Sequence, residues 1–151
     1  MAVQSSPVLP QTPKVSVTQF TSSSPVSTVA GSTFTTLYTG GTNGTKVTSV
    51  MVSNTSTSAL INAILTITST ASGASANYPI GSVTLASLAS YDTVLNSVNL
   101  FASTTIPLPV DGDGNPYLFL TSSLNTLAVG ISSAIQTAGG RVSFTVIAAD
   151  F

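Results

Sequence analysis

Three segments near the C-terminal end have side-chain patterns typical of β-strands, and two of them alternate with a period of two residues. Arg141–Ala148 has apolar residues at its even-numbered positions, Thr126–Ser132 has its large apolar residues at odd-numbered positions, and Tyr117–Thr121 is apolar on both faces. Successive side chains of a β-strand point to opposite faces, so this period is typical of strands. Ser122–Asn125 and Ser133–Gly140 are short polar links, and we expect the three strands to form an antiparallel meander.

Further strand patterns precede this region. Thr33–Ser53 holds two of them around Asn43-Gly44, a dipeptide that favours tight turns because both residues tolerate positive φ. We expect a hairpin there, with a β-bulge near Ser49, where the parity of the apolar residues slips. Ala59–Ser69 is the longest strand candidate and carries apolar residues on both faces, so we expect it at the centre of a sheet. Val98–Ala102 fits either a strand end or one helical turn.

Many short strand patterns, separated by Gly, Asn and Ser, occur without an amphipathic helix pattern. The sequence therefore predicts an all-β fold, an antiparallel β-sandwich of jelly-roll or immunoglobulin-like type over residues 26–151.

Residues 1–25 hold four of the eight prolines, and proline fixes φ and removes backbone donors, so we expect an extended segment. Two interpretations fit it, a disordered tail and an arm that lies across a neighbouring subunit. The second is our prediction, because apolar side chains recur along the segment. With the terminal phenylalanine, these give the candidate partner-binding residues, which are Val8, Leu9, Val15, Val17, Phe20 and Phe151.

Charged side chains make up 5% of the residues, and the formal net charge is −1. Binding to nucleic-acid phosphates needs a basic face, and binding to anionic lipid needs a polybasic patch, so we expect neither nucleic acid nor membrane as a partner. No apolar run approaches the ~20 residues of a spanning helix. The first residues lack the basic and apolar regions of a secretory signal, so we expect synthesis in a cytoplasm.

The residue types that enzymes use most for acid–base and nucleophilic chemistry are missing, because the sequence has no His, Cys or Glu. We therefore expect no enzymatic activity. Asp111–Asn115 resembles the first half of a calcium loop, but Pro116 stands where that loop has its turn glycine. A polar turn before Tyr117 explains these residues equally well, and we expect no metal or other cofactor.

The low charge also bears on assembly. A β-rich chain with so few charges has little protection against association of its strand edges. Such a surface suits a chain that is covered by copies of itself or by a larger assembly, and we expect a homo-oligomer.

Several short motifs resemble those of small structural proteins of tailed bacteriophages. They are Leu37-Tyr38-Thr39, Asn43–Val47 leading into Val50–Asn54, Asn99-Leu100, Asp113–Leu118 and Ala148–Phe151. The resemblance implies a β-sandwich that decorates or cements the exterior of a capsid, with the major capsid protein as partner and often as a trimer. The alternative is a head-fibre or tail adhesin domain that binds host-surface carbohydrate, for which Tyr38, Tyr78, Tyr91 and Tyr117 are stacking candidates. Lone tyrosines on strands more often serve the core or a sheet face.

Overall fold

The computed structural model describes residues 12–27, 33–57, 61–70, 76–87, 97–104, 107–136 and 138–151. Within these ranges the chain forms nine strands and one short 3-10 helix. They are β1 (Thr12–Phe20), β2 (Thr35–Thr39), β3 (Thr45–Asn54), β4 (Ile61–Ser69), β5 (Ala76–Leu85), β6 (Ser97–Asn99), η1 (Leu100–Ser103), β7 (Leu118–Leu120), β8 (Asn125–Ile131) and β9 (Val142–Asp150).

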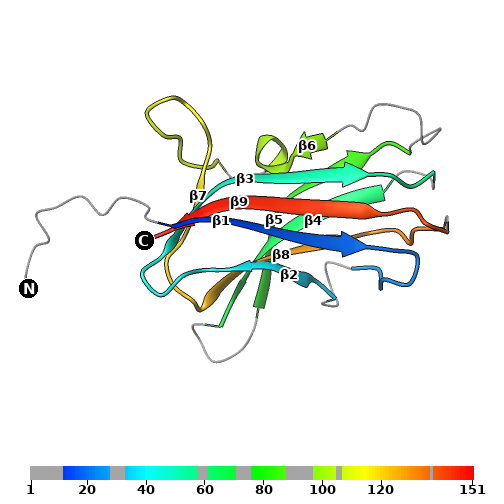
Figure 1. Ribbon diagram of the computed structural model, residues 1–151, viewed down its shortest axis with the longest axis horizontal. Helices are drawn as coiled ribbons and strands as arrows, with labels where there is room; N and C mark the ends of the chain where they lie inside the picture. Colours follow the sequence, from blue (N-terminus) through cyan, green and yellow to red (C-terminus); the bar gives the residue numbers. More distant parts are fainter. Residues whose placement is uncertain are drawn as a thin grey trace, which may run out of the picture.

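The strands form two antiparallel sheets. The β9 sheet has the order β1-β9-β3-β6, with β7 also paired to β3, and the β8 sheet has the order β2-β8-β4-β5. Figure 1 shows β3, β9 and β1 side by side in front, with β8, β4 and β5 crossing behind them. The two sheets pack against each other around one hydrophobic core, so the predicted antiparallel β-sandwich is confirmed.

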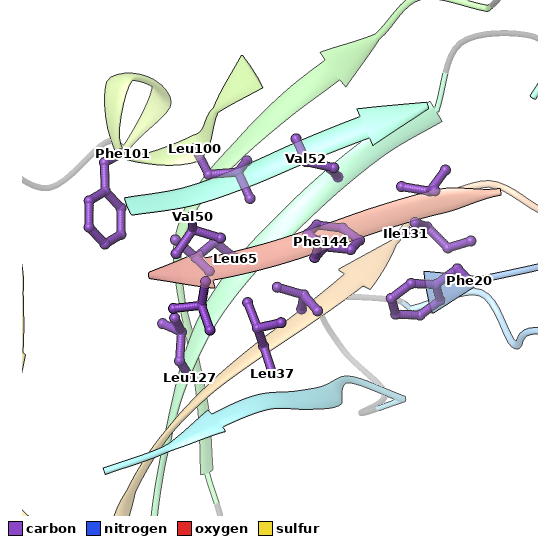
Figure 2. Close-up of a cluster of buried hydrophobic side chains, with 14 of the residues drawn as sticks. Phe20, Leu37, Val50, Val52, Leu65, Leu100, Phe101, Leu127, Ile131 and Phe144 are labelled. Carbon is purple, nitrogen blue, oxygen red and sulfur yellow. The ribbon is translucent and has the colours of Figure 1, made fainter. Parts of the chain in front are cut away.

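The core lies between the inner faces of the two sheets (Figure 2). Val142, Phe144, Val146 and Ala148 of β9 are buried there as the alternation predicts, and Phe144 has no exposed surface. The β8 sheet contributes Leu65, Leu127 and Ile131 from the opposite side, all fully buried. Close packing of these apolar side chains is the main term that stabilises such a sandwich.

Two predicted strand arrangements, a meander and a hairpin, are wrong. The expected meander does not form, because β7 pairs with β3, β8 with β2 and β4, and β9 with β1 and β3. The expected hairpin does not form either, because β2 and β3 belong to different sheets. Gly40–Gly44 therefore passes from one sheet to the other, with Gly44 at φ 102°. Alternation specifies a strand and its buried face, whereas a short link can turn back or cross the sandwich.

Two local predictions agree with the structure, and the structure also assigns a segment for which the sequence allows two alternatives. The register of β3 against β9 shifts between Val47 and Ser49, which is the expected β-bulge. The strand β4 lies inside its sheet, between β8 and β5. The Val98–Ala102 segment contains both a strand end and a helical turn, because β6 ends at Asn99 and η1 follows it. The Asn99 side chain caps η1 by accepting a hydrogen bond from the Phe101 N–H at 3.1 Å.

An N-terminal arm that extends to residue 25 does not match the structure. Residues 12–20 form β1, which pairs with β9 from Thr12 opposite Asp150 to Phe20 opposite Val142. The sandwich therefore includes residues 12–20. Proline spacing misled the prediction, because Pro13 lies on an edge strand, where the missing N–H is tolerated.

Candidate interaction surface

Three exposed apolar side chains of β1 and β9 project from the outer face of the β9 sheet. Val15 is 68% exposed, Val17 is 55% exposed and Ile147 is 46% exposed. Val15 lies directly opposite Ile147 in the β1–β9 register, and Val17 lies opposite Thr145, two residues along the same face. These three residues are called the apolar strip below. The outer face of an antiparallel sheet is usually polar, so the strip is a candidate contact surface.

The strip borders an open strand edge. Among the described residues, β1 pairs with β9 and with no second strand, so the backbone along its other side is unpaired by strand hydrogen bonds. Proteins usually protect such an edge with charges, but Lys14 is the only charged residue in β1. Thr18 contacts the neighbouring β2 through its side chain, whose hydroxyl donates to the Thr36 carbonyl at 3.4 Å.

The structure separates the predicted partner-binding residues. Val15 and Val17 lie together on the surface, as a contact would require, whereas Val8 and Leu9 fall outside the described residues. Phe20 was wrongly assigned to a partner surface, because it is 2% exposed and its ring meets that of Phe144 edge-on at 5.6 Å. The sequence held a signal against Phe20, because its even-numbered position lies on the opposite face of a strand from Val15 and Val17.

Ile147 is the strip residue that the sequence analysis missed. It occupies an odd-numbered position of β9, and the other odd-numbered residues there, such as Ser143 and Thr145, point away from the core. A large apolar residue at an outward position was the available signal, and its partner Val15 could not be known before β1 was placed beside β9.

Phe151 lies at the end of the β9 sheet, outside the strip. Its ring contacts that of Phe119 at 5.4 Å, and its backbone N–H donates to the Gly44 carbonyl at 3.2 Å. Phe119 is 43% exposed and stands opposite Lys46 in the register, on the same outer face as the strip. Phe151 therefore helps to hold in place the Gly40–Gly44 link, which precedes β3.

The neighbouring Asp150 joins three distant parts of the chain. Its Oδ1 accepts hydrogen bonds from the Tyr38 hydroxyl at 2.9 Å and from the Thr45 hydroxyl at 2.5 Å, and the Gly41 N–H donates to the same threonine oxygen at 2.8 Å. Burial, followed by the hydrogen bond and charge of Asp150, raises the pKa of Tyr38 to about 12. These hydrogen bonds fix the end of β9 to the start of β3 and to the Gly40–Gly44 link that precedes β3.

This pKa gives a testable pH dependence. Because the folded state holds the Tyr38 proton more tightly than the unfolded chain, Tyr38 contributes stability below pH 10 that is lost as the pH rises towards 12. We expect urea unfolding to show a decline in stability over this range, and we expect Tyr38→Phe to reduce the decline. Tyr78→Phe, at a residue 56% exposed, is the control and should leave the decline in place. Equal declines in both variants would contradict the role of Tyr38.

The Asp111 loop is built as a turn. Asp111 Oδ1 accepts hydrogen bonds from the N–H groups of Asp113 at 3.1 Å and Asn115 at 2.9 Å. The bond from Asn115 is the main cause that lowers the pKa of Asp111. Lys46 lies 3.7 Å from the other carboxylate oxygen, and its ammonium sits 4.8 Å from the centre of the Tyr117 ring. In the described ranges, no three His, Cys, Asp or Glu side chains gather as metal ligands would.

A cleft of about 390 Å³ lies beside β5 and β6. Asn54, Thr84, Leu85, Ala86, Ser87, Ser97 and Val98 line it. The side chain of Asn54 already makes hydrogen bonds within the protein. Its amide N–H donates to the Ala86 carbonyl at 2.9 Å, and its oxygen accepts from the Ser56 N–H at 2.8 Å. None of these described lining residues is aromatic, so the cleft offers no stacking platform for a sugar.

Comparisons with known proteins add no identity. Neither a family model nor a curated protein sequence matches the chain. The described part of the chain contains no helix of the length and apolar character needed to cross a membrane.

Proposed function

We propose that the chain is a non-enzymatic structural protein of a tailed-phage virion that binds the exterior of the capsid as a decoration or cement protein. Its partner is the major capsid protein. The observation that carries the proposal is the apolar strip, three large apolar side chains that stand exposed on a rigid sheet in a nearly uncharged chain. The proposal that the assembly is a virion rests on the resemblance of the Ala148–Phe151 and Asp113–Leu118 motifs to small phage structural proteins.

The strip supports a contact role through its energetics. Burial of a whole Val or Ile side chain stabilises by about 1.5–3 kcal/mol, so covering the half-exposed strip would contribute on the order of 3 kcal/mol. The strip lies on β1 and β9, and β9 is hydrogen-bonded on both sides, so little conformational entropy is lost on contact. A surface of this kind suits permanent attachment in a repeated array better than transient recognition.

The alternative, a head-fibre or tail adhesin domain, needs a sugar platform. The described cleft lacks aromatic lining, and the partly exposed Tyr117 ring lies beneath the ammonium of Lys46. These observations favour the capsid role over carbohydrate binding.

The contact predicts attachment that resists salt. Particles of the phage that encodes the chain are purified, heads are separated from tails, and each fraction is washed at low salt and in 1 M NaCl. We expect the chain in the head fraction, and we expect it to stay bound at 1 M NaCl, because charge contacts are screened within about 3 Å there while apolar contacts are not. Release by salt would contradict an apolar contact. Recovery in the tail fraction, or absence from particles, would contradict the capsid role.

A further inference from the structure

We propose that two copies of this chain associate through their β1 edges, which pair antiparallel about a two-fold axis at Ser16 and join the two β9 sheets into one. The occupant of the open edge is therefore a second copy of the chain. This contact is made in solution and does not depend on the virion role.

The sequence of β1 fits this self-pairing. The strand runs from Thr12 to Phe20, so an antiparallel register centred on Ser16 pairs all nine residues. The same register places Val15 opposite Val17 of the partner subunit, and Val17 opposite the partner's Val15. Both valines are on the outer face, so cross-strand valine pairs form twice, with Ile147 beside each Val15. The pattern Val-Ser-Val is symmetric about the axis, as an isologous contact requires.

Charge also favours a second copy. Lys14 is the only charged residue of β1, and the register places it opposite Thr18 of the partner subunit, with the two lysines about 13 Å apart along the strands. A contact between identical surfaces is penalised by like charges that face each other, and none do so within the paired strands. Pro13 lacks an N–H, so it removes at most one hydrogen bond at each end of the pair.

The size of the contact sets its strength. A nine-residue strand is about 30 Å long, and a strip of that length and ~10 Å wide is about 300 Å² per copy, below the ~800 Å² per partner of a standard interface. We therefore expect a dimer that dissociates at low micromolar concentration. On a capsid lattice, where copies are held near one another, the same contact would be favoured. The resemblance to phage proteins implies a trimer, whereas this edge is suited to a two-fold contact.

Cross-linking tests the register. The chain has no cysteine, so a single introduced cysteine is unique. Residues that face each other across an antiparallel pair have Cα atoms ~4.5–5.5 Å apart, which a disulfide spans. Ser16→Cys is expected to give a covalent dimer under mild oxidation of the full chain. Gln19→Cys is the matched control, because the two Gln19 positions are about 20 Å apart in this register, and it should stay monomeric.

Sedimentation of the purified chain tests the contact itself. Because the expected interface is smaller than the standard size, concentrations from roughly 5 to 500 µM are compared, an affinity range of about 7–4.5 kcal/mol, and the mass should rise from 15.2 kDa towards twice that value. The double variant Val15→Lys/Val17→Lys should stay monomeric, because it places lysines opposite each other. Val110→Lys alters another valine, which is 60% exposed and outside β1, and should behave as the parent chain.

A monomer at every concentration would overturn the proposal, as would a trimer or a dimer that the double variant leaves intact. Equal cross-linking of Ser16→Cys and Gln19→Cys would overturn the register. None of these results depends on a capsid, so they are distinct from failure of the proposed function, which is measured on particles.

Discussion

Replacing Phe20 with alanine is expected to lower the free energy of unfolding by about 3–5 kcal/mol, the usual cost of deleting a buried aromatic ring. The Phe20 ring is 2% exposed, and it packs edge-on against Phe144 in the centre of the core. The substitution removes this contact and leaves a cavity beside β9. Urea unfolding followed by circular dichroism measures the change.

Val17→Ala is the control in the same strand. Val17 is 55% exposed, so its truncation should change stability by less than about 0.5 kcal/mol. If β1 were an arm that orders only on a neighbouring subunit, both substitutions would leave the isolated domain equally stable. That result would contradict the place of β1 in the sandwich.

Replacing Gly130 with alanine is expected to destabilise the fold by about 1–3 kcal/mol through overpacking. A Cβ at this position of β8 would lie 2.5 Å from Ser27 Cβ and 2.8 Å from Phe34 Cδ1, and closer still to the Ser27 hydroxyl. Ser27 has little freedom to move away, because its backbone N–H donates to the Ile131 carbonyl at 2.7 Å and its hydroxyl donates to the Thr33 carbonyl at 2.5 Å. Ser27 and Phe34 therefore cover the outer face of β8 at Gly130.

Gly112→Ala is the matched control for the same chemical change. No heavy atom lies within 4 Å of a Cβ built at Gly112. Neither glycine has a positive φ, so the backbone tolerates alanine at both positions. The control is expected to keep or slightly raise the melting temperature, since alanine restricts the unfolded chain more than glycine does. A Gly130→Ala variant as stable as the Gly112→Ala variant would contradict the close contact with Ser27.

The sequence was informative about strands and uninformative about their neighbours. The alternation in Arg141–Ala148 identified β9 and its buried face, because side-chain direction is a local property of the strand. Whether a link such as Gly40–Gly44 turns back or crosses depends on packing between residues far apart in the chain. The same limit hid the Asp150 group, since Tyr38 and Asp150 are separated by 112 positions.

Only part of the contact surface could be predicted from the sequence. Val15 and Val17 were named because they are apolar, and their spacing by two places them on one face of a strand. Phe20 has the opposite parity, and the alternation alone implied that it faces away from both valines. The prediction that Val15, Val17 and Phe20 all anchor one arm was inconsistent with this alternation. Ile147, which lies opposite Val15 in the same chain, is 132 positions further along the sequence (147 − 15 = 132). Only the β1–β9 register brings the two residues together.

The most direct test of the proposed function is a cryo-electron microscopy map of particles of the encoding phage, compared with particles whose gene for this chain is deleted. We expect density for a small β-sandwich repeated over the outer surface of the icosahedral shell, and this density should disappear in the deletion and return when purified chain is added. Density confined to the tail tip or to head fibres, or identical maps for the two kinds of particle, would contradict it.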